Sequence, residues 1–224
     1  MFVLPLERMR LVSRQGPRPQ DARTGAVMSA EAAAARAPAD VTWRIHNGTD
    51  WTNAAGETEG AELRAGAPAV VEWADNRGGS TPFAGYGNAI VLRYSSRVRC
   101  LFAHCQLVTR SPGETVAAGD VVALCGRSSR PGRLISHAHL HLEFVTRWPL
   151  RSDDQANRYD CLDSFAAAGY LLNPAGILEP ADARSATSSG SSGSSGSSAS
   201  SPSKGSAIVD LALLWFLAYG RRRP

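Results

Sequence analysis

The residues of this chain best suited to chemistry are its five histidines, which fall in only three places. His46 opens the motif His-Asn-Gly-Thr-Asp, which ends at Asp50, and imidazole nitrogen and carboxylate oxygen are both good zinc ligands. The glycine between them lets the chain bend, so that residues four apart can converge on one ion. His139 and His141 lie in the run His-Leu-His-Leu-Glu-Phe, whose strict alternation is typical of a β-strand. Because residues i and i+2 of a strand share a face, these two imidazoles are predicted to lie side by side, opposite an apolar stripe.

The other polar candidates admit more than one interpretation. His104 lies in the segment Leu-Phe-Ala-His-Cys, where it shares strand parity with Phe102, and a lone histidine on a strand is more often structural. His137 has the parity of His139 and is interpreted as a residue at the rim of any site. Glu143 has the same parity, and either orients an imidazole or is an exposed strand residue. Taken alone, each motif is weak evidence, and the paired histidines could be solvated surface residues.

Short Val, Leu and Ile runs between turn signals predict a β-rich body. A short helix is expected over 163–172, and one or two helical turns over 29–36 with Ser29 as the N-cap. The expected strands are 68–73, 88–94, 98–107, 121–125 and 139–144.

The net charge of +4 comes from the ends of the chain. Residues 41–180 carry 13 arginines and 14 acidic residues, and this balance argues against a nucleic-acid groove in the body. Residues 181–224 carry 5 basic and 2 acidic residues, and basic residues at the extreme C-terminus suit a membrane surface. No nucleic-acid partner is therefore expected.

The four cysteines, Cys100, Cys105, Cys125 and Cys161, contain no CxxC pair, which argues against a structural zinc knuckle. Their even number permits two disulfides in an oxidising compartment, and equally permits four small buried apolar side chains. Between these alternatives we favour at least one disulfide.

Both ends differ in composition from the body at 41–180. Residues 1–40 are predicted to be partly disordered or the edge of a domain, or to reflect a misplaced start, and their apolar opening is too short for a signal peptide. Residues 181–206 form a Ser/Gly-rich run that predicts a flexible linker. Residues 207–224 join an apolar stretch to terminal arginines, and we prefer a membrane-directed tail to a docked helix, although the stretch is shorter than the ~20 residues of a spanning helix. This layout resembles bacterial C-terminal sorting signals of the GlyGly-CTERM kind.

Together the motifs resemble the lysostaphin/LytM type of zinc peptidase, peptidase family M23, in order as well as in content. The family pattern runs from HxGxD through a glycine-entered strand, a histidine-bearing strand and a Val-x-x-Gly-x-x-Val turn to HLHFE. The resemblance covers about residues 41–178, and its departures, such as Cys105 in place of leucine, remove no polar group of the pattern. The corresponding segments are HNGTD at 46–50, GYGNAIVLRY at 85–94, LFAHC at 101–105, ETVAAGDVVALCG at 114–126 and HLHLEF at 139–144.

The resemblance implies a mainly β fold, with a compact antiparallel β-sheet or barrel-like domain, loop insertions and few short helices. It implies that His46, Asp50 and His141 hold one Zn²⁺ ion, and that His104 and His139 are the catalytic histidines. Three protein ligands leave one position of a tetrahedral zinc ion open, which is the arrangement of a catalytic site. The catalytic histidines would orient the attacking water, stabilise the oxyanion and protonate the leaving amine.

The implied activity is that of a metallo-endopeptidase that cuts stem or cross-bridge peptides of peptidoglycan. Such an enzyme would act as a monomer outside the cytoplasm, in the periplasm or at the cell surface, with the C-terminal tail as a candidate membrane anchor. The alternative is a non-catalytic or latent relative that binds the cell wall and regulates another hydrolase, and retention of all five polar residues counts against it. A lipoyl-type carrier barrel is rejected because the only lysine, Lys204, lies in the linker. An unrelated zinc lyase would leave HNGTD unexplained.

Overall fold

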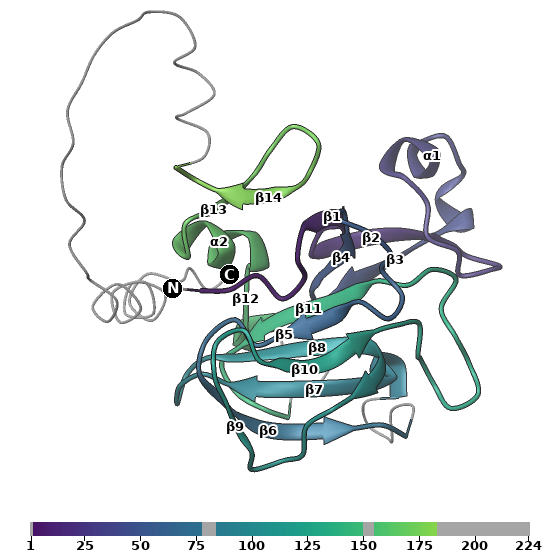
Figure 1. The fold of residues 1–224 in the computed structure, drawn as a ribbon. Helices are drawn as coiled ribbons and strands as arrows, with labels where there is room; N and C mark the ends of the chain where they lie inside the picture. Colours follow the sequence, from purple (N-terminus) through teal and green to yellow (C-terminus); the bar gives the residue numbers. More distant parts are fainter. Residues whose placement is uncertain (1, 78–83, 150–154, 183–224) are drawn as a thin grey trace, which may run out of the picture.

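The computed structural model of the chain describes residues 2–77, 84–149 and 155–182, which form a mainly β structure (Figure 1). The two α-helices in this part of the chain are short, α1 (Ala30–Ala34) and α2 (Cys161–Ala167), and the 3-10 turns are Pro38–Asp40, Ala84–Tyr86 and Gln155–Asn157. The mainly β, antiparallel fold expected from the sequence is confirmed. The strands are β1 (Met9–Ser13), β2 (Gly16–Asp21), β3 (Val41–His46), β4 (Thr49–Asn53), β5 (Glu62–Arg64), β6 (Ala69–Asp75), β7 (Asn88–Arg93), β8 (Arg99–Val108), β9 (Thr115–Val116), β10 (Val121–Cys125), β11 (Leu140–Val145), β12 (Arg158–Tyr159), β13 (Tyr170–Leu172) and β14 (Leu178–Pro180).

The five strands expected from hydrophobic runs are present as β6, β7, β8, β10 and β11, each within one or two residues of its predicted ends. The predicted N-cap is also confirmed, because the side chain of Ser29 accepts the Ala32 N–H at 3.1 Å. The helix expected over 163–172 is only partly correct. α2 begins at Cys161, two residues before the predicted start, because Asp160 caps it. Gly169, with φ at 86°, then turns the chain so that the last residues of the range form β13.

One antiparallel sheet forms the body, with the strand order β1-β4-β11-β8-β7-β6-β9. β10 pairs with both β8 and β5, and β12 pairs with β11. Two separate ribbons, β2–β3 and β13–β14, complete the fold. In the body sheet His141 of β11 lies directly between Asp50 of β4 and Ala103 of β8, so the register alone brings segments far apart in sequence together.

The two faces of the body sheet bury different clusters. The main core contains Trp51, Phe102 and Leu142, and Phe165 of α2 packs edge-on against Trp51 with ring centroids 5.4 Å apart. The smaller cluster lies on the opposite face, which we call the site face. Its buried members are Ala89, Val91, Leu101 and Ala103.

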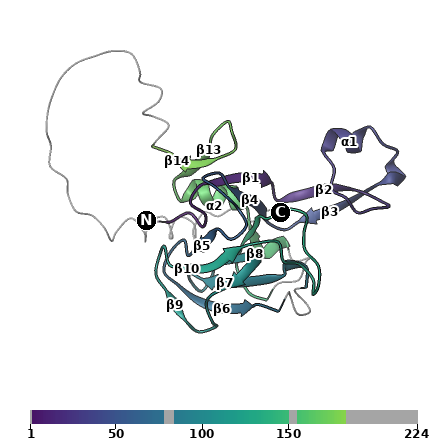
Figure 2. The same ribbon diagram turned by 45° about the vertical axis from the view of Figure 1, so that its right-hand side comes forward.

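The N-terminal residues are part of this architecture. Leu6 and Met9 are fully buried in the main core, and β1 pairs with β4 along the edge of the body sheet. β2 and β3, with α1 between them, form an arm (residues 16–46) that stands out from the body in Figure 2. The domain boundary placed at residue 41 stays a prediction, and the structure adds residues 2–13 to the packing of the body.

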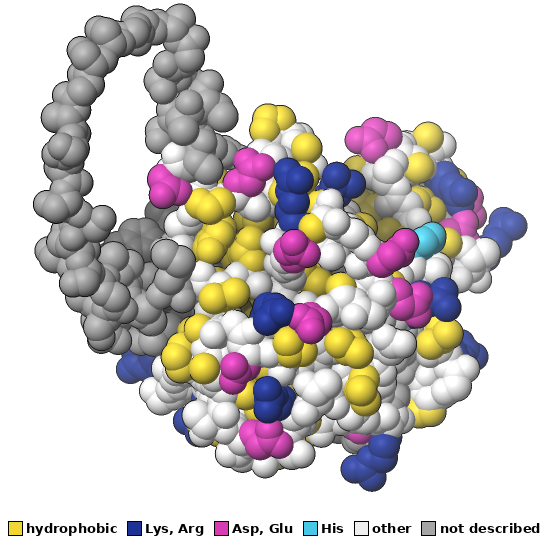
Figure 3. Space-filling model, in the orientation of Figure 1, with side chains coloured by type: hydrophobic (Ala, Val, Ile, Leu, Met, Phe, Trp, Pro, Cys, Tyr) yellow, Lys and Arg dark blue, Asp and Glu magenta, His cyan; other side chains and the backbone are white. Residues whose placement is uncertain are grey.

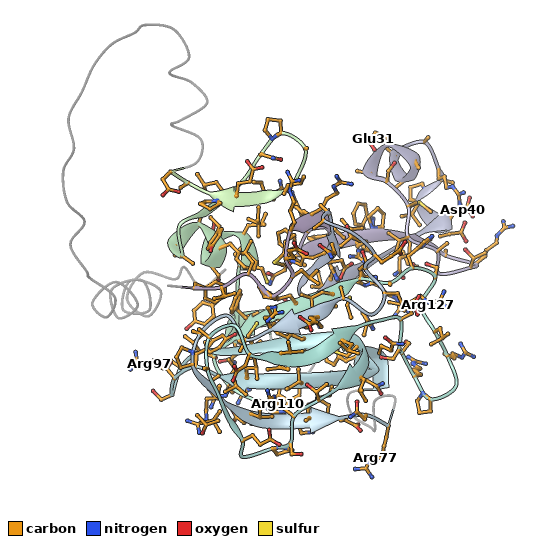
Figure 4. All side chains as sticks on the ribbon, in the orientation of Figure 1. Glu31, Asp40, Arg77, Arg97, Arg110 and Arg127 are labelled. Atoms are coloured by element: carbon orange, nitrogen blue, oxygen red, sulfur yellow. The ribbon has the colours of Figure 1, made fainter. Side chains whose placement is uncertain are left out.

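Charged side chains are distributed without a single-sign patch on the face shown in Figure 3, where basic and acidic groups are interspersed. Arg77 and Arg97 lie at the outer edge of the body and point away from it (Figure 4). This distribution agrees with the near-neutral body that the sequence predicts.

The preference for a disulfide is wrong for this structure. Cys100, Cys105, Cys125 and Cys161 are all free and buried, and all four belong to the main core. They act there as small apolar side chains, and burial raises the pKa of each thiol above its ordinary value.

In the described part of the chain no helix has the length and apolar character needed to cross a membrane. The predicted tail at 207–224 and all but the first two residues of the predicted linker at 181–206 lie outside the described residues.

Candidate metal centre

Three donor atoms from three strands converge at one end of the body sheet. β3 ends at His46, and β4 and β11 are paired so that Asp50 and His141 are direct partners. Nε2 of His46 lies 3.0 Å from Oδ1 of Asp50, and Nδ1 of His141 lies 3.0 Å from the same oxygen. The two imidazole nitrogens are also 3.0 Å apart. The structure therefore brings together all three residues that the sequence proposed as metal ligands.

Gly48, between the first two of these ligands, is required for close packing. A Cβ at this position would lie 2.2 Å from the carbonyl oxygen of Leu142 and 2.8 Å from Cγ of Glu143. Its φ is not in the left-handed region, so the conformational freedom expected from the motif is not the reason for glycine here. The absence of a side chain is what allows the turn before β4 to approach β11.

The outer nitrogen of each metal-facing imidazole has a fixed acceptor. Nδ1 of His46 lies 2.9 Å from the carbonyl oxygen of Arg14, which accepts its hydrogen in the tautomer that leaves Nε2 free for an ion. Nε2 of His141 donates in the same way to Oε1 of Glu143 at 3.0 Å. The nitrogens left to face Asp50 are then those that can offer a lone pair to an ion.

This donor set fits a zinc ion. Two imidazole lone pairs and a carboxylate oxygen within 3.0 Å of one another repel unless positive charge lies between them. For tetrahedral zinc with bonds of about 2.0–2.1 Å, donor atoms would be ~3.3 Å apart, which is close to the separations observed. In the metal-free protein the positive charge between these atoms is that of protonated His141. Burial opposes the charged form of His141, but hydrogen bonds to Asp50 and Glu143 raise its pKa to about 9.

Glu143 is a buried part of this centre. It is 1% exposed, so the alternative of an exposed strand residue is wrong and that of an imidazole-orienting residue is confirmed. Its carboxylate also accepts Tyr86 Oη–H at 2.7 Å and Arg158 Nε–H at 2.9 Å. Burial disfavours its ionisation, yet the hydrogen bond from His141 and the charges around it lower its pKa to about 2. Asp50 behaves alike: burial opposes its charge, but hydrogen bonds with both metal-facing imidazoles hold its pKa well below the usual range.

His139 stands beside the donor atoms without joining them. Its Nε2 is 3.6 Å from Oδ1 of Asp50, and its Nδ1 donates to the carbonyl oxygen of His137 at 3.1 Å. Burial lowers the pKa of His139, so the imidazole is neutral and its Nε2 offers a lone pair to the site. The side chain of His137 is exposed and contacts Ser136, in agreement with its interpretation as a rim residue.

His104 reaches the site through a backbone irregularity. Strict alternation would place it with Phe102 in the main core, and this expectation is wrong. One residue of β7 opposes two residues of β8 between the pairs Asn88–Cys105 and Ile90–Phe102, and His104 adopts φ of 60° in this bulge. Its ring therefore lies on the site face, with its centroid 5.0 Å from that of His139.

The ring of His104 is held from the side opposite the metal donors. Its Nδ1 donates to the carbonyl oxygen of Ser128 at 2.8 Å, and burial lowers its pKa to about 3. Ser128 is in turn fixed by its hydroxyl, which donates to the Cys105 carbonyl at 2.6 Å and accepts the Asn88 N–H at 2.8 Å. Gly87 permits this contact, since its φ is 65° and a Cβ there would lie 2.4 Å from the Oγ of Ser128.

Sequence reasoning missed the residues that support these five side chains. Most of them act through a main-chain carbonyl group or through their position in the strand register, and neither leaves a signature in the sequence. The supporting residues are Arg14, Arg18, Tyr86, Ser128 and Arg158.

Comparison with known proteins gives results in keeping with this geometry. Over 102 residues the chain is 31% identical to the DD-carboxypeptidase/endopeptidase Mpg of Neisseria meningitidis serogroup B, and equally to that of Neisseria gonorrhoeae. The alignment covers 46% of this chain but only 20% of those relatives, so the chain spans about a fifth of their length.

Two solved structures are similar to this chain over part of its length. The catalytic domain of lysostaphin from Staphylococcus simulans is 17% identical with a TM-score of 0.46, covering 67% of this chain and 87% of that one. A zinc-containing peptidase from Vibrio cholerae is 22% identical with a TM-score of 0.44, covering 64% of this chain and 36% of that one. The model of peptidase family M23 matches residues 44–155, half of the chain, and includes His46, Asp50, His104, His139 and His141. The chain belongs to peptidase family M23.

Proposed function

We propose that this protein is a zinc-dependent endopeptidase that hydrolyses peptide bonds in the stem or cross-bridge peptides of peptidoglycan. The observation that carries the proposal is the convergence of His46, Asp50 and His141, with donor atoms 3.0 Å apart and with the outer imidazole nitrogens already hydrogen-bonded. One zinc ion held by these three residues would keep an open position. Zinc in such a site supplies a Lewis acid and lowers the pKa of water to about 7.

His104 and His139 are proposed as the catalytic histidines. Main-chain carbonyls hold the hydrogen of each ring on Nδ1, so each Nε2 offers a lone pair toward the centre. Burial lowers the pKa of both rings, so both are neutral near pH 7 and each keeps an unprotonated Nε2 that can accept a hydrogen bond from the attacking water. A ring that takes a proton from this water during the reaction can then protonate the leaving amine or donate a hydrogen bond to the oxyanion.

The substrate class is supported by membership of the family and by the Neisseria relatives, whose printed name is DD-carboxypeptidase/endopeptidase. Peptidoglycan lies outside the cytoplasm, so we propose that the protein acts there, as a monomer, with residues 207–224 as a candidate membrane-directed tail. The linker at 181–206 would then separate the peptidase domain from this tail.

The experiment that tests this function compares the full-length protein with His46→Ala, His139→Ala and His137→Ala. Zinc content is measured after dialysis, and activity as soluble fragments released from purified peptidoglycan. We expect about one zinc per chain in the wild type, loss of zinc in the first variant, and retained zinc with activity lowered ~10²-fold or more in the second. The third variant is the matched control, because the side chain of His137 is exposed and contacts only Ser136 among the contacts described for it.

Two outcomes would contradict the proposal in different ways. A wild-type protein that binds no zinc would refute the assignment of a metal centre. A wild-type protein that binds zinc and leaves several types of peptidoglycan intact would favour the alternative of a latent or non-catalytic cell-wall-binding protein that regulates another hydrolase.

A further inference from the structure

Besides the ligand His46, the N-terminal arm brings the side chain of Arg18 in β2 to the metal centre. Its Nη2 donates to Oδ2 of Asp50 at 2.9 Å and also hydrogen-bonds to the hydroxyl of Ser13. The side chain is 22% exposed and that of Asp50 is 7% exposed, so this ion pair is largely shielded from water. Such charge-assisted hydrogen bonds are roughly twice as strong as neutral ones.

The two oxygens of Asp50 therefore have separate partners. Oδ1 faces the imidazoles of His46, His139 and His141, and Oδ2 faces Arg18. A carboxylate held at one oxygen cannot rotate freely about its χ2 torsion. It is restricted to presenting the other oxygen to an ion, as a monodentate ligand.

Strand register explains how the arm holds this position. Ser13 of β1 is the direct partner of Asp50, and Gly16 of β2 is the direct partner of His46. The chain between them carries Arg14, whose carbonyl accepts the Nδ1–H of His46. Nη2 of Arg18 also lies 2.7 Å from this same nitrogen, which cannot accept in the tautomer that leaves Nε2 free for an ion. In that tautomer the hydrogen bonds of Arg18 at the centre are those to Asp50 and Ser13.

We propose that Arg18 is a positioning residue of the metal centre, which raises zinc affinity by orienting the carboxylate of Asp50. The proposal rests on the zinc site described under the proposed function and goes beyond it. Arg18 lies outside residues 44–155, which match the family model, so this chain supplies part of its own metal centre from the N-terminal arm. The guanidinium charge repels a cation, but it is paired with the carboxylate. Loss of a hydrogen-bonding partner behind a metal ligand typically weakens metal binding 10–100-fold.

The test measures zinc affinity of the full-length protein by competition with a chromophoric chelator, for the wild type, Arg18→Ala, Arg18→Lys and Arg44→Ala. We expect Arg18→Ala to raise the zinc Kd about 10–100-fold. Arg18→Lys should recover part of the loss, because an ammonium group can bond one carboxylate oxygen but lacks the planar fork. Arg44 is the matched control: it is the cross-strand partner of Arg18 in the same ribbon, and it is exposed. Its replacement removes the same charge and should leave the Kd within about twofold.

A second measurement separates orientation of the ligand from stability of the arm. The cobalt(II)-loaded proteins should show a changed visible absorption spectrum in Arg18→Ala and a wild-type spectrum in Arg44→Ala, because this spectrum reports the geometry of the ligands. Zinc affinity in Arg18→Ala equal to or tighter than that of the wild type would overturn the proposal, as would equal weakening by both alanine variants. A wild type without zinc would instead refute the metal centre itself.

Discussion

Replacement of Gly48 by alanine is expected to push apart the two strands that carry Asp50 and His141. The added Cβ would lie 2.2 Å from the carbonyl oxygen of Leu142, whereas ordinary contacts of this kind begin at 3.4 Å. The obstacle is main chain, so it cannot rotate away, and the strands must separate by about 1 Å. Overpacking of this kind typically costs about 1–3 kcal/mol of unfolding free energy.

The same displacement should weaken zinc binding. Metal–ligand distances tolerate deviations of about 0.2 Å, and Asp50 and His141 lie on the two strands that would separate. We therefore expect Gly48→Ala to raise the zinc Kd at least about 10-fold, since 1.4 kcal/mol corresponds to a factor of ten. The assays are urea denaturation of the metal-free protein followed by far-UV circular dichroism, and zinc competition with a chelator.

Gly56→Ala is the matched control for this experiment. Gly56 has no atom within 4 Å of the position its Cβ would take, and its φ is not in the left-handed region. We expect its stability to stay within about 0.5 kcal/mol of the wild type and its zinc Kd to be unchanged. If Gly48→Ala behaves like Gly56→Ala in both assays, the assignment of Gly48 to close packing is wrong.

Three further predictions follow from the titratable and redox-active groups. In urea denaturation the metal-free protein should lose up to about 3 kcal/mol of unfolding free energy between pH 6.5 and 9.5, because the pKa of His141 is raised to about 9 in the folded protein. The stabilisation by protonated His141 is complete below the pKa of the unfolded chain, near 6.5, and disappears as pH rises through 9. An unfolding free energy that does not change over this range would contradict the prediction. His104→Ala should keep one zinc and lower kcat on peptidoglycan by about 10²–10⁴-fold, and loss of the metal would contradict its assignment as a catalytic residue rather than a ligand. Without reductant, a thiol reagent should label four cysteines in urea and almost none in the native protein, and fewer than four in urea would indicate a disulfide.

The support of the site depended on tertiary structure in a way that sequence patterns could not reveal. Alternation along β8 predicted that His104 would share a face with Phe102, yet one extra residue in the strand turns it to the other face. A bulge is specified by how two strands pair, so no local pattern signals it. Arg18 is a similar case, because its relation to Asp50 exists only after β1 and β2 have paired with different partners.

The sequence by itself named the five polar residues of the candidate site, through the order of the motifs that resemble the family, and it determined the strand that carries two of them. This was possible because a strand has a period of two, so the run at 139–144 specified both the apolar face in the main core and the polar face with Glu143. Only the tertiary structure decided that Glu143 is buried behind His141, since parity gives the face of a residue and not its burial. It also decided that the cysteines are core residues, and which nitrogen of each imidazole faces the candidate metal centre. Those choices depend on carbonyl and carboxylate acceptors contributed by distant segments, whose positions follow from the packing of the whole sheet.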